Sequence, residues 1–296
     1  MTNQAGFQRS FRDDPTLIGR LFDLIDTSFP GLRQASQSGP GLGPPWEEHS
    51  TPFVRFDHEL AVTHVGLVEI PLVLMGRRVM VGGIHAVCTR PEYRRRGYYR
   101  QIMYEVLAYC DRWYETLILF TAQPELYEPF GFRELGEHLF LAPWTSAGAG
   151  ASAGRGFRKL NLYEPNDFRL VERLLAAREP VSNTVGVVHE TGLFGFNEGK
   201  RPLHYAEDVD VIVCLELDGS RLKLFDVVGV RLCSLADIIE RIPQRIDNIE
   251  FYFSPDRFEV AARAVPHLVD GDSHLMVRGA FAAEGQAFMI PRCARC

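Results

Sequence analysis

Hydrophobic and polar positions divide the chain into blocks of different period, and each block predicts one element. Apolar residues recur at helical spacing over residues 15–29 and 99–113, which predicts two amphipathic helices. Asp13 and Asp14 stand just ahead of the first helix and are candidates to cap it. Shorter β-prone runs bounded by turn residues predict antiparallel strands at 53–56, 60–74 and 79–89, with Pro71 as a potential break in the second.

The pattern around these elements completes the first half of the chain. Residues 31–52 are rich in Gly, Pro and Ser and predict a loop. After the second helix, 116–121 (TLILFT) predicts a buried strand, a short helix carries Tyr127, and 132–142 predicts a last strand. This order of elements predicts an α+β fold with a mixed sheet covered by helices.

Residues 145–156 (TSAGAGASAGRG) are small and flexible, and they predict a linker. Beyond it, the pattern predicts a helix over 167–178, a hairpin around Asp218-Gly219, a helix from its cap Ser234 to Arg241, and strands at 249–253 and 274–277. The second half thus repeats the order of the first. We predict two domains, residues 1–144 and 157–296, joined by the linker at 145–156.

Composition narrows the class of protein. A chain of 296 residues with 46% hydrophobic residues suits two domains with sizeable cores. The net charge of −6 argues against a nucleic-acid partner, because such proteins are usually basic. The N-terminus has no apolar signal core and no apolar run is long enough to cross a membrane, so we expect a cytoplasmic protein without a membrane partner.

The stretch from Met80 to Tyr99 carries the strongest chemical signal. An apolar strand leads into a turn with three successive arginines and a glycine, and the turn leads into the amphipathic helix. The first N–H groups of a helix have no internal partners, so this arrangement predicts a site for an anion such as a pyrophosphate. The alternative is an ordinary solvated basic turn.

These residues resemble the Gcn5-related N-acetyltransferase (GNAT) superfamily. Arg94, Gly97 and Tyr99 fall on the fixed positions of its Q/R-x-x-G-x-G/A turn, although Tyr99 replaces the usual small residue. A second signature, Y-x-x-x-G-F, is matched by Tyr127 to Phe132. The turn is similar to that of the enhanced-intracellular-survival group, and residues 61–96 are similar to the aminoglycoside 2′-N-acetyltransferases. The resemblance covers residues 10–143 and implies the GNAT fold, with a degenerate second GNAT-like domain as in tandem members.

The resemblance also implies acetyl-CoA as co-substrate and names the residues that bind it. Main-chain groups of Val87, Cys88 and Thr89 would pair with the pantetheine arm, and one N–H would polarise the thioester carbonyl. The pyrophosphate would lie against the turn, formed by Arg94, Arg95, Arg96, Gly97, Tyr98, Tyr99 and Arg100. The second half lacks such a turn, so we expect it not to bind CoA.

Catalysis needs an acid for the leaving thiolate and a base for the amine. Tyr127 is the candidate acid, because a phenol holds its proton at neutral pH; the alternative is a tyrosine packed beside Phe130 and Phe132. Glu69 and His85 are the candidate bases, with a water relay as a third possibility. In the enhanced-intracellular-survival group the base is the terminal carboxylate, a position that falls here on Cys296.

The acceptor is expected to be a primary amine of a small molecule, with an aminoglycoside or a polyamine as the first choice and amino acids or protein N-termini still open. Phe194, Phe196, Glu198 and Asp208 are candidates for a wall that attracts a cationic amine. The alternative function is a catalytically silent CoA-binding or sensor module. Cys293 and Cys296 form a CxxC pair without a second pair, so no metal site is predicted, and the six cysteines imply no disulfide framework. The oligomeric state stays open.

Overall fold

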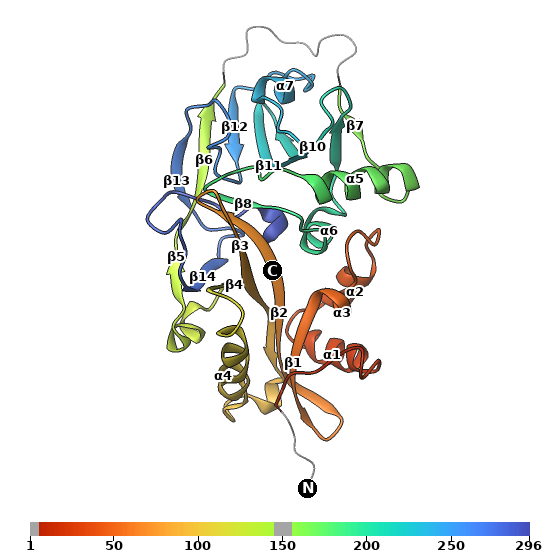
Figure 1. The fold of residues 1–296 in the computed structure, drawn as a ribbon, viewed down its shortest axis with the longest axis vertical. Helices are drawn as coiled ribbons and strands as arrows, with labels where there is room; N and C mark the ends of the chain where they lie inside the picture. The colour runs from red at the N-terminus through yellow and green to blue at the C-terminus, as the bar shows by residue number, and fades with distance from the viewer. Residues whose placement is uncertain (1–5, 145–155) are drawn as a thin grey trace.

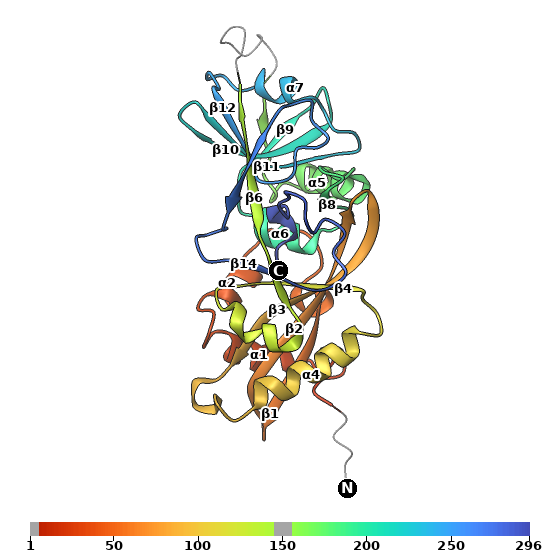
Figure 2. The same ribbon diagram turned by 90° about the vertical axis from the view of Figure 1, so that its left-hand side faces the viewer.

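The computed structural model describes residues 6–144 and 156–296. The molecule is elongated, with one mixed β-sheet toward each end (Figures 1 and 2). Each sheet has seven strands. The mixed sheets and the helices packed on them confirm the predicted α+β class. The predicted linker at 145–156 lies outside the described residues except for Gly156.

The first sheet has the strand order β1-β2-β3-β4-β14-β5, and β8 pairs with β2 on the same edge as β1, farther along the strand at Leu72–Leu74. Its strands are β1 (Ser50–Asp57), β2 (Leu60–Leu74), β3 (Arg77–Thr89), β4 (Thr116–Thr121), β5 (Arg133–Leu135), β8 (Val185–Val187) and β14 (His274–Gly279). Helix α4 (Tyr98–Cys110) packs in one cluster with Phe53, and α1 (Leu17–Ile25) in another with Val54. Since neighbouring strand residues point to opposite faces, the two helices cover the two faces of the sheet.

Most elements of the first half lie close to their predicted bounds, although few match at both ends. β2 and β4 match at both ends, and Pro71 does not interrupt β2. Two predictions were wrong. The expected loop at 31–52 contains the short helices α2 (Leu32–Gln37) and α3 (Trp46–His49). The expected strand at 132–142 is divided at Gly136 into β5 and β6 (Glu137–Pro143), which belong to different sheets.

The second sheet has the strand order β13-β6-β12-β11-β10-β9-β7. Besides β6, its strands are β7 (Arg158–Lys159), β9 (Leu203–Ala206), β10 (Val211–Asp218), β11 (Arg221–Gly229), β12 (Asn248–Phe251) and β13 (Arg263–His267). Helices α5 (Pro165–Ala177) and α7 (Leu235–Ile239) accompany it. Ser234 caps α7 as predicted, in a capping box with Asp237, although the helix ends before Arg241.

The two sheets exchange strands across the predicted domain boundary. Strand β6 precedes residues 145–156 but lies between β12 and β13 in the second sheet. Strand β14 follows that segment but lies between β4 and β5 in the first sheet. The predicted division into 1–144 and 157–296 therefore does not separate the sheets, because each sheet completes its hydrogen bonding with a strand from the other half.

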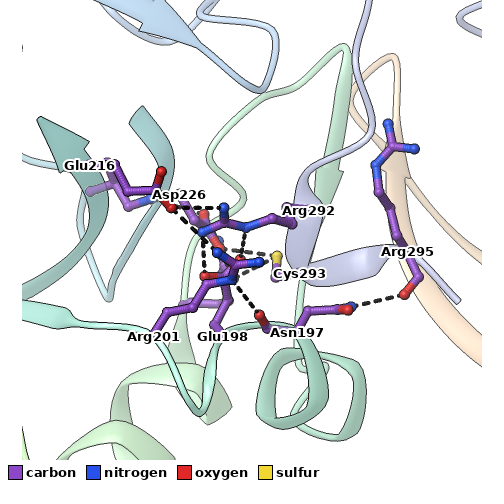
Figure 3. A network of polar contacts seen from close by, with 10 residues as sticks. Asn197, Glu198, Arg201, Glu216, Asp226, Arg292, Cys293 and Arg295 are labelled. Carbon is purple, nitrogen blue, oxygen red and sulfur yellow. Dashed lines mark hydrogen bonds and ion pairs between the residues drawn. The ribbon is translucent and has the colours of Figure 1, made fainter. Parts of the chain in front are cut away.

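The C-terminal segment lies in the middle of the molecule, between the sheets (Figure 1). A polar network around the short helix η4 (Arg292–Ala294) anchors it (Figure 3). Arg292 forms two hydrogen bonds to Glu198 of helix α6 (Gly192–Glu198), and Asn197 Nδ2 donates to the carbonyl of Arg295 at 2.9 Å. The network fixes α6 against the chain end, and both then face the cavity described below.

Two findings limit the classes of site in the described part of the chain. None of its helices has the length and apolar character needed to cross a bilayer. No group of three or more His, Cys, Asp and Glu residues is arranged there to hold a metal ion.

Candidate active site

The site begins where two parallel strands separate. β3 and β4 pair with each other at Gly82–Leu117 and Gly83–Ile118. β3 then continues to Thr89 and β4 to Thr121 without further pairing between the two. β3 carries a bulge opposite β2, between its pairings with His64 and Gly66, and Ala86 within it has φ of 48°. A bulge bends its strand, which accounts for the divergence. The edge of β3 beyond Gly83 is left without a strand partner on the β4 side.

A cavity of about 1500 Å³ opens at this point. One side consists of the end of β3, the basic turn and the start of α4; the other consists of α2, α3, α6 and the chain end at Arg295 and Cys296. Of the predicted site residues, the cavity is lined by His85, Val87, Cys88, Thr89, Arg94, Arg95, Gly97, Tyr98, Tyr99, Arg100 and Tyr127. The fold thus gathers nearly all of them around one space.

The basic turn leaves the start of α4 open to a ligand. Gly97 is the N-cap residue with φ of 78°, and Arg95 has φ of 61°. Within residues 6–144 and 156–296, no side chain caps the helix, and no atom lies within 4 Å of the position that a Cβ on Gly97 would take. Successive N–H groups in such a turn form a concave anion site that the helix dipole reinforces.

The three arginines of the turn differ in their surroundings. Arg94 and Arg95 line the cavity, and Arg94 Nε donates to the carbonyl of Thr89 at 3.1 Å. Arg96 does not line it, because its guanidinium stacks on the Tyr93 ring at 4.8 Å and donates to the Glu92 carbonyl. The structure therefore gives Arg96 a part in holding the turn rather than in contacting a ligand.

Tyr127 lies at the divergence of the two strands. Its side chain is 7% exposed and packs against Phe132 and Tyr99. Burial raises the pKa of Tyr127 to about 12, although a hydrogen bond with Thr121 lowers it somewhat. The phenol is therefore protonated at neutral pH and can donate a hydrogen bond into the cavity.

Tyr99, which replaces a small residue of the family pattern, holds the segment that carries Tyr127. Its hydroxyl donates to the carbonyl of Leu126 at 2.9 Å. Its ring meets those of Tyr127 and Phe130 edge to face, with centroids at 6.2 and 5.5 Å. Burial raises the pKa of Tyr99, which therefore stays neutral. The large side chain thus fixes the position of the candidate acid.

The two candidate bases lie in different places. His85 lines the cavity, with its ring 5.0 Å from that of Trp46, and its Nε2 forms a hydrogen bond with Ser50 Oγ at 2.8 Å. Gly66 opposite permits this, since a Cβ there would lie 2.5 Å from His85 Nε2. Glu69 is exposed, does not line the cavity and accepts a hydrogen bond from Tyr114. Its neighbour Val68 does line it, so Glu69 points to the opposite face of the sheet and is removed as a candidate.

Burial keeps the histidines of this region neutral. It lowers the pKa of His85 to about 3, with smaller contributions from His64 and His49, and it lowers the pKa of His64 to about 4. His64 Nδ1 donates to the carbonyl of Ala86 at 2.8 Å and so gives this carbonyl of the bulge a hydrogen-bond partner. At neutral pH His85 presents an uncharged ring to the cavity, and it is a weak base.

Several lining residues escaped the sequence analysis. Trp46, His49 and Ser50 lie at the end of the segment predicted as a loop, where an amphipathic signal is too short to detect. Lys200 and Arg295 reach the cavity only through the packing of α6 and the chain end. The side chain of Cys296 also lines it, with Sγ 3.8 Å from the carbonyl of Ile84.

Of the aromatic and acidic wall that the sequence suggested, only Phe196 faces the cavity. Phe194 is fully buried in the core between the sheets. Glu198 is buried and paired with Arg292, and Asp208 accepts two hydrogen bonds from Arg241. The prediction of an acidic wall was wrong because tertiary packing uses these carboxylates in ion pairs.

Comparison with known proteins gives a family match for part of the chain. Residues 17–135 match the family model of the acetyltransferase (GNAT) domain. No curated protein sequence is significantly similar to the chain. Among solved structures, a protein of Enterococcus faecalis V583 described as a probable N-acyltransferase superposes with a TM-score of 0.58 at 13% identity, covering 93% of this chain and 72% of that one.

Two further structures share the fold. A GCN5-related N-acetyltransferase of Kribbella flavida has a TM-score of 0.52 at 18% identity, covering 90% of this chain and 69% of its own. Eis1 of Mycobacterium abscessus has a TM-score of 0.53 at 12% identity, covering 90% of this chain and 71% of its own. At such identities the likeness is one of fold.

Proposed function

We propose that this chain, whose residues 17–135 match the acetyltransferase (GNAT) domain, transfers the acetyl group of acetyl-CoA to a primary amine of a small molecule. One observation carries the proposal. The unpaired edge of β3, the uncapped start of α4 and the phenol of Tyr127 all face one cavity. That is the set of groups that a CoA thioester needs.

The cofactor would bind along β3. Main-chain groups of Val87 to Thr89 would pair with the pantetheine amides as an added strand does, because β4 no longer occupies that edge. The pyrophosphate would lie against the N–H groups that begin α4, with Arg94, Arg95 and Arg100 around it. This route leads the thioester toward Tyr127.

The reaction proceeds in a ternary complex. The neutral amine attacks the carbonyl carbon, a carbon–nitrogen bond forms, and the carbon–sulfur bond breaks with its electron pair leaving on sulfur. The nitrogen loses one proton and the thiolate gains one. Tyr127 donates a hydrogen bond to the departing sulfur; since its pKa of about 12 exceeds that of a thiol, stabilisation contributes more than complete proton transfer.

Removal of the amine proton is assigned to His85 with Ser50 or to water beside them. A pKa near 3 means that His85 is uncharged at neutral pH and keeps one ring N–H, so its other ring nitrogen serves as a hydrogen-bond acceptor that passes the proton on. The acceptor amine must therefore reach the thioester already deprotonated. Glu69 has no part in the proposal, because it faces the other side of the sheet.

The direct test combines calorimetry with acetyl-CoA and an assay for CoA release. We expect Tyr127→Phe to bind acetyl-CoA as the wild type does and to lower kcat by about 10- to 100-fold, because one transition-state hydrogen bond is lost. Tyr163→Phe is the matched control, since Tyr163 is 75% exposed and does not line the cavity.

Three results would change the proposal. If the protein does not bind acetyl-CoA at millimolar concentration, acetyl-CoA is excluded as its co-substrate. Equal turnover of Tyr127→Phe and wild type would remove Tyr127 from the mechanism. Tight acetyl-CoA binding without transfer to any of a broad set of amines would favour a silent CoA-binding or sensor module.

A further inference from the structure

The charge of the cavity is informative about the acceptor. Asp272 carries the one acidic side chain among the described residues that line it. The lining cations are Arg94, Arg95, Arg100, Lys200 and Arg295, and the first three belong to the phosphate side. A wall of this kind supplies no series of carboxylates for a polycation, and each unpaired ammonium taken from water would carry a desolvation cost.

The side opposite the basic turn is apolar and aromatic. Its large lining side chains are Phe29, Leu32, Leu42, Trp46, Leu193 and Phe196. The Trp46 ring is fixed by Phe22, at a centroid distance of 5.5 Å, and meets His85 at 5.0 Å. An apolar body in this part would therefore lie directly beside the candidate proton acceptor.

Two carboxylates near α6, Glu190 and Glu198, are not available to a cationic ligand. Glu190 is 4% exposed and accepts hydrogen bonds from the N–H groups of Leu193 and Phe194 at 2.8 and 2.9 Å. Burial raises its pKa to about 7, so that its charge is partly suppressed at neutral pH. Glu198 is fully buried against Arg292. Neither carboxylate lines the cavity.

Lys200 adds a positive group at the same side. Its Nζ donates to the carbonyl of Ala35 and to Ser38 Oγ at 3.0 and 2.9 Å, and both of these acceptors are uncharged. These bonds hold the end of α6 against α2. The field that Lys200 contributes repels a second ammonium.

From these observations we infer that the acceptor is a monoamine with an apolar, aromatic body, and not a polyamine or an aminoglycoside. The inference rests on the proposed function and names its substrate class. Stacking on Trp46 and contact with Leu193 and Phe196 bind the body, while the single amine, once neutral, meets His85 without needing a carboxylate partner.

The test compares 2-phenylethylamine with spermidine and kanamycin as acceptors. In the wild type we expect kcat/KM for 2-phenylethylamine to be at least about tenfold higher than for either polycation, which corresponds to about 1.4 kcal/mol. Equal or higher values for spermidine or kanamycin would overturn the inference while leaving acetyl transfer itself intact.

A charge introduced into the wall makes the test sharper. Phe196→Glu places a carboxylate at a lining position that is 42% exposed, and Leu217→Glu does so at a position 40% exposed on β10 that does not line the cavity. We expect Phe196→Glu to shift the preference toward spermidine by about tenfold and Leu217→Glu to leave it unchanged. An unchanged preference in Phe196→Glu would contradict the inference.

Binding provides a readout that does not depend on turnover. Calorimetry of each amine is measured on the protein alone and on the protein saturated with CoA. Tighter binding of 2-phenylethylamine than of spermidine supports the inference even if no acetyl group is transferred, a result that would count against the proposed function only. Tighter spermidine binding, or no binding of either amine, would overturn it.

Discussion

The two sheets share a strand order and differ at the place where a cofactor could bind. In each, an antiparallel pair (β2–β3, β10–β11) is followed by a parallel neighbour (β4, β12), which then pairs with a strand from the other half. In the first sheet the parallel pairing stops at Gly83–Ile118. In the second, β11 pairs with β12 from Arg221–Asn248 to Leu224–Phe251 and then likewise continues, to Gly229, without β12 beside it. The same topology therefore leaves the end of the central strand without its parallel neighbour in both sheets, and the sheets differ in what lies beside that end.

The helices that follow the central strands, α4 and α7, differ at their first turns. α4 begins at Gly97 without a side-chain cap, so its first N–H groups face the cavity. α7 begins at Ser234, whose hydroxyl accepts from the N–H of Asp237, while the Asp237 carboxylate accepts from the N–H of Ser234. A capping box uses the donors that an anion would need. This supports the proposal that the second half does not bind CoA.

The space beside β11 is filled by side chains. Arg292 stacks on the Phe225 ring at 3.5 Å, and Arg178 forms two hydrogen bonds to Asp226, both residues being almost completely buried (Figure 3 shows Asp226 and Arg292). Cys293 Sγ approaches Asp226 at 3.1 Å. The comparison teaches that one strand order can serve either binding or stability, depending on whether its central groups are left free or paired internally.

The largest effect on stability is expected in the second sheet, where side chains fill the space beside β11. Arg178→Met should lower the free energy of unfolding by about 3–5 kcal/mol, because it leaves Asp226 buried without its partner. Urea unfolding measures the change. Arg173→Met is the matched control: the Arg173–Asp210 pair has side chains 50% and 44% exposed, so less than about 1 kcal/mol is expected. Equal losses in both variants would contradict this account of the second sheet.

The stability of the first sheet should depend on pH through His64, which lies on β2. Its pKa falls from 6.5 unfolded to about 4 folded, so its stabilising contribution is complete above pH 6.5 and is lost as the pH falls toward 4. Glu190, with a pKa raised to about 7, has the opposite slope, since its contribution is lost as the pH rises from 4.5 to 7. The wild-type profile alone therefore does not isolate His64, and a variant is required.

We expect the stability of His64→Asn relative to the wild type to improve by about 3 kcal/mol between pH 6.5 and 4, the equivalent of the shift in pKa. His58→Asn is the control, because the His58 side chain is 97% exposed. Urea unfolding at several pH values gives the comparison. Parallel profiles for His64→Asn and wild type would show that His64 titrates normally in the folded protein.

The third prediction separates backbone strain from cofactor binding. Gly97 and Gly219 both have positive φ, 78° and 60°, with open space at the Cβ position. Valine at either site should lower stability by about 1–3 kcal/mol. Only Gly97→Val should weaken acetyl-CoA binding, by about 100-fold, because it alters the turn whose N–H groups face the cavity. Calorimetry that finds similar affinities for the two variants would move the pyrophosphate away from α4.

Much of the fold and part of the site follow from local sequence. Hydrophobic period and turn residues determine β2, β4, α4 and the hairpin around Gly219, because these elements depend on neighbours within a few residues. The basic turn is likewise local, since a glycine at positive φ and the arginines around it are consecutive in the chain. So the sequence by itself was sufficient for the GNAT fold and for locating the basic turn, to which the proposal assigns the CoA pyrophosphate.

Tertiary structure decided the rest. No local signal indicates that β6 and β14 change sheets, because either strand satisfies its alternation equally well in both. The sequence offers both Glu69 and His85 as candidate bases. Only the folded sheet shows that His85 faces the cavity and that Glu69 does not. The charge of the acceptor side depends on which carboxylates find buried partners, as Glu198 does with Arg292. Such pairings join residues far apart in the chain, and their energies depend on burial, which only the folded structure sets.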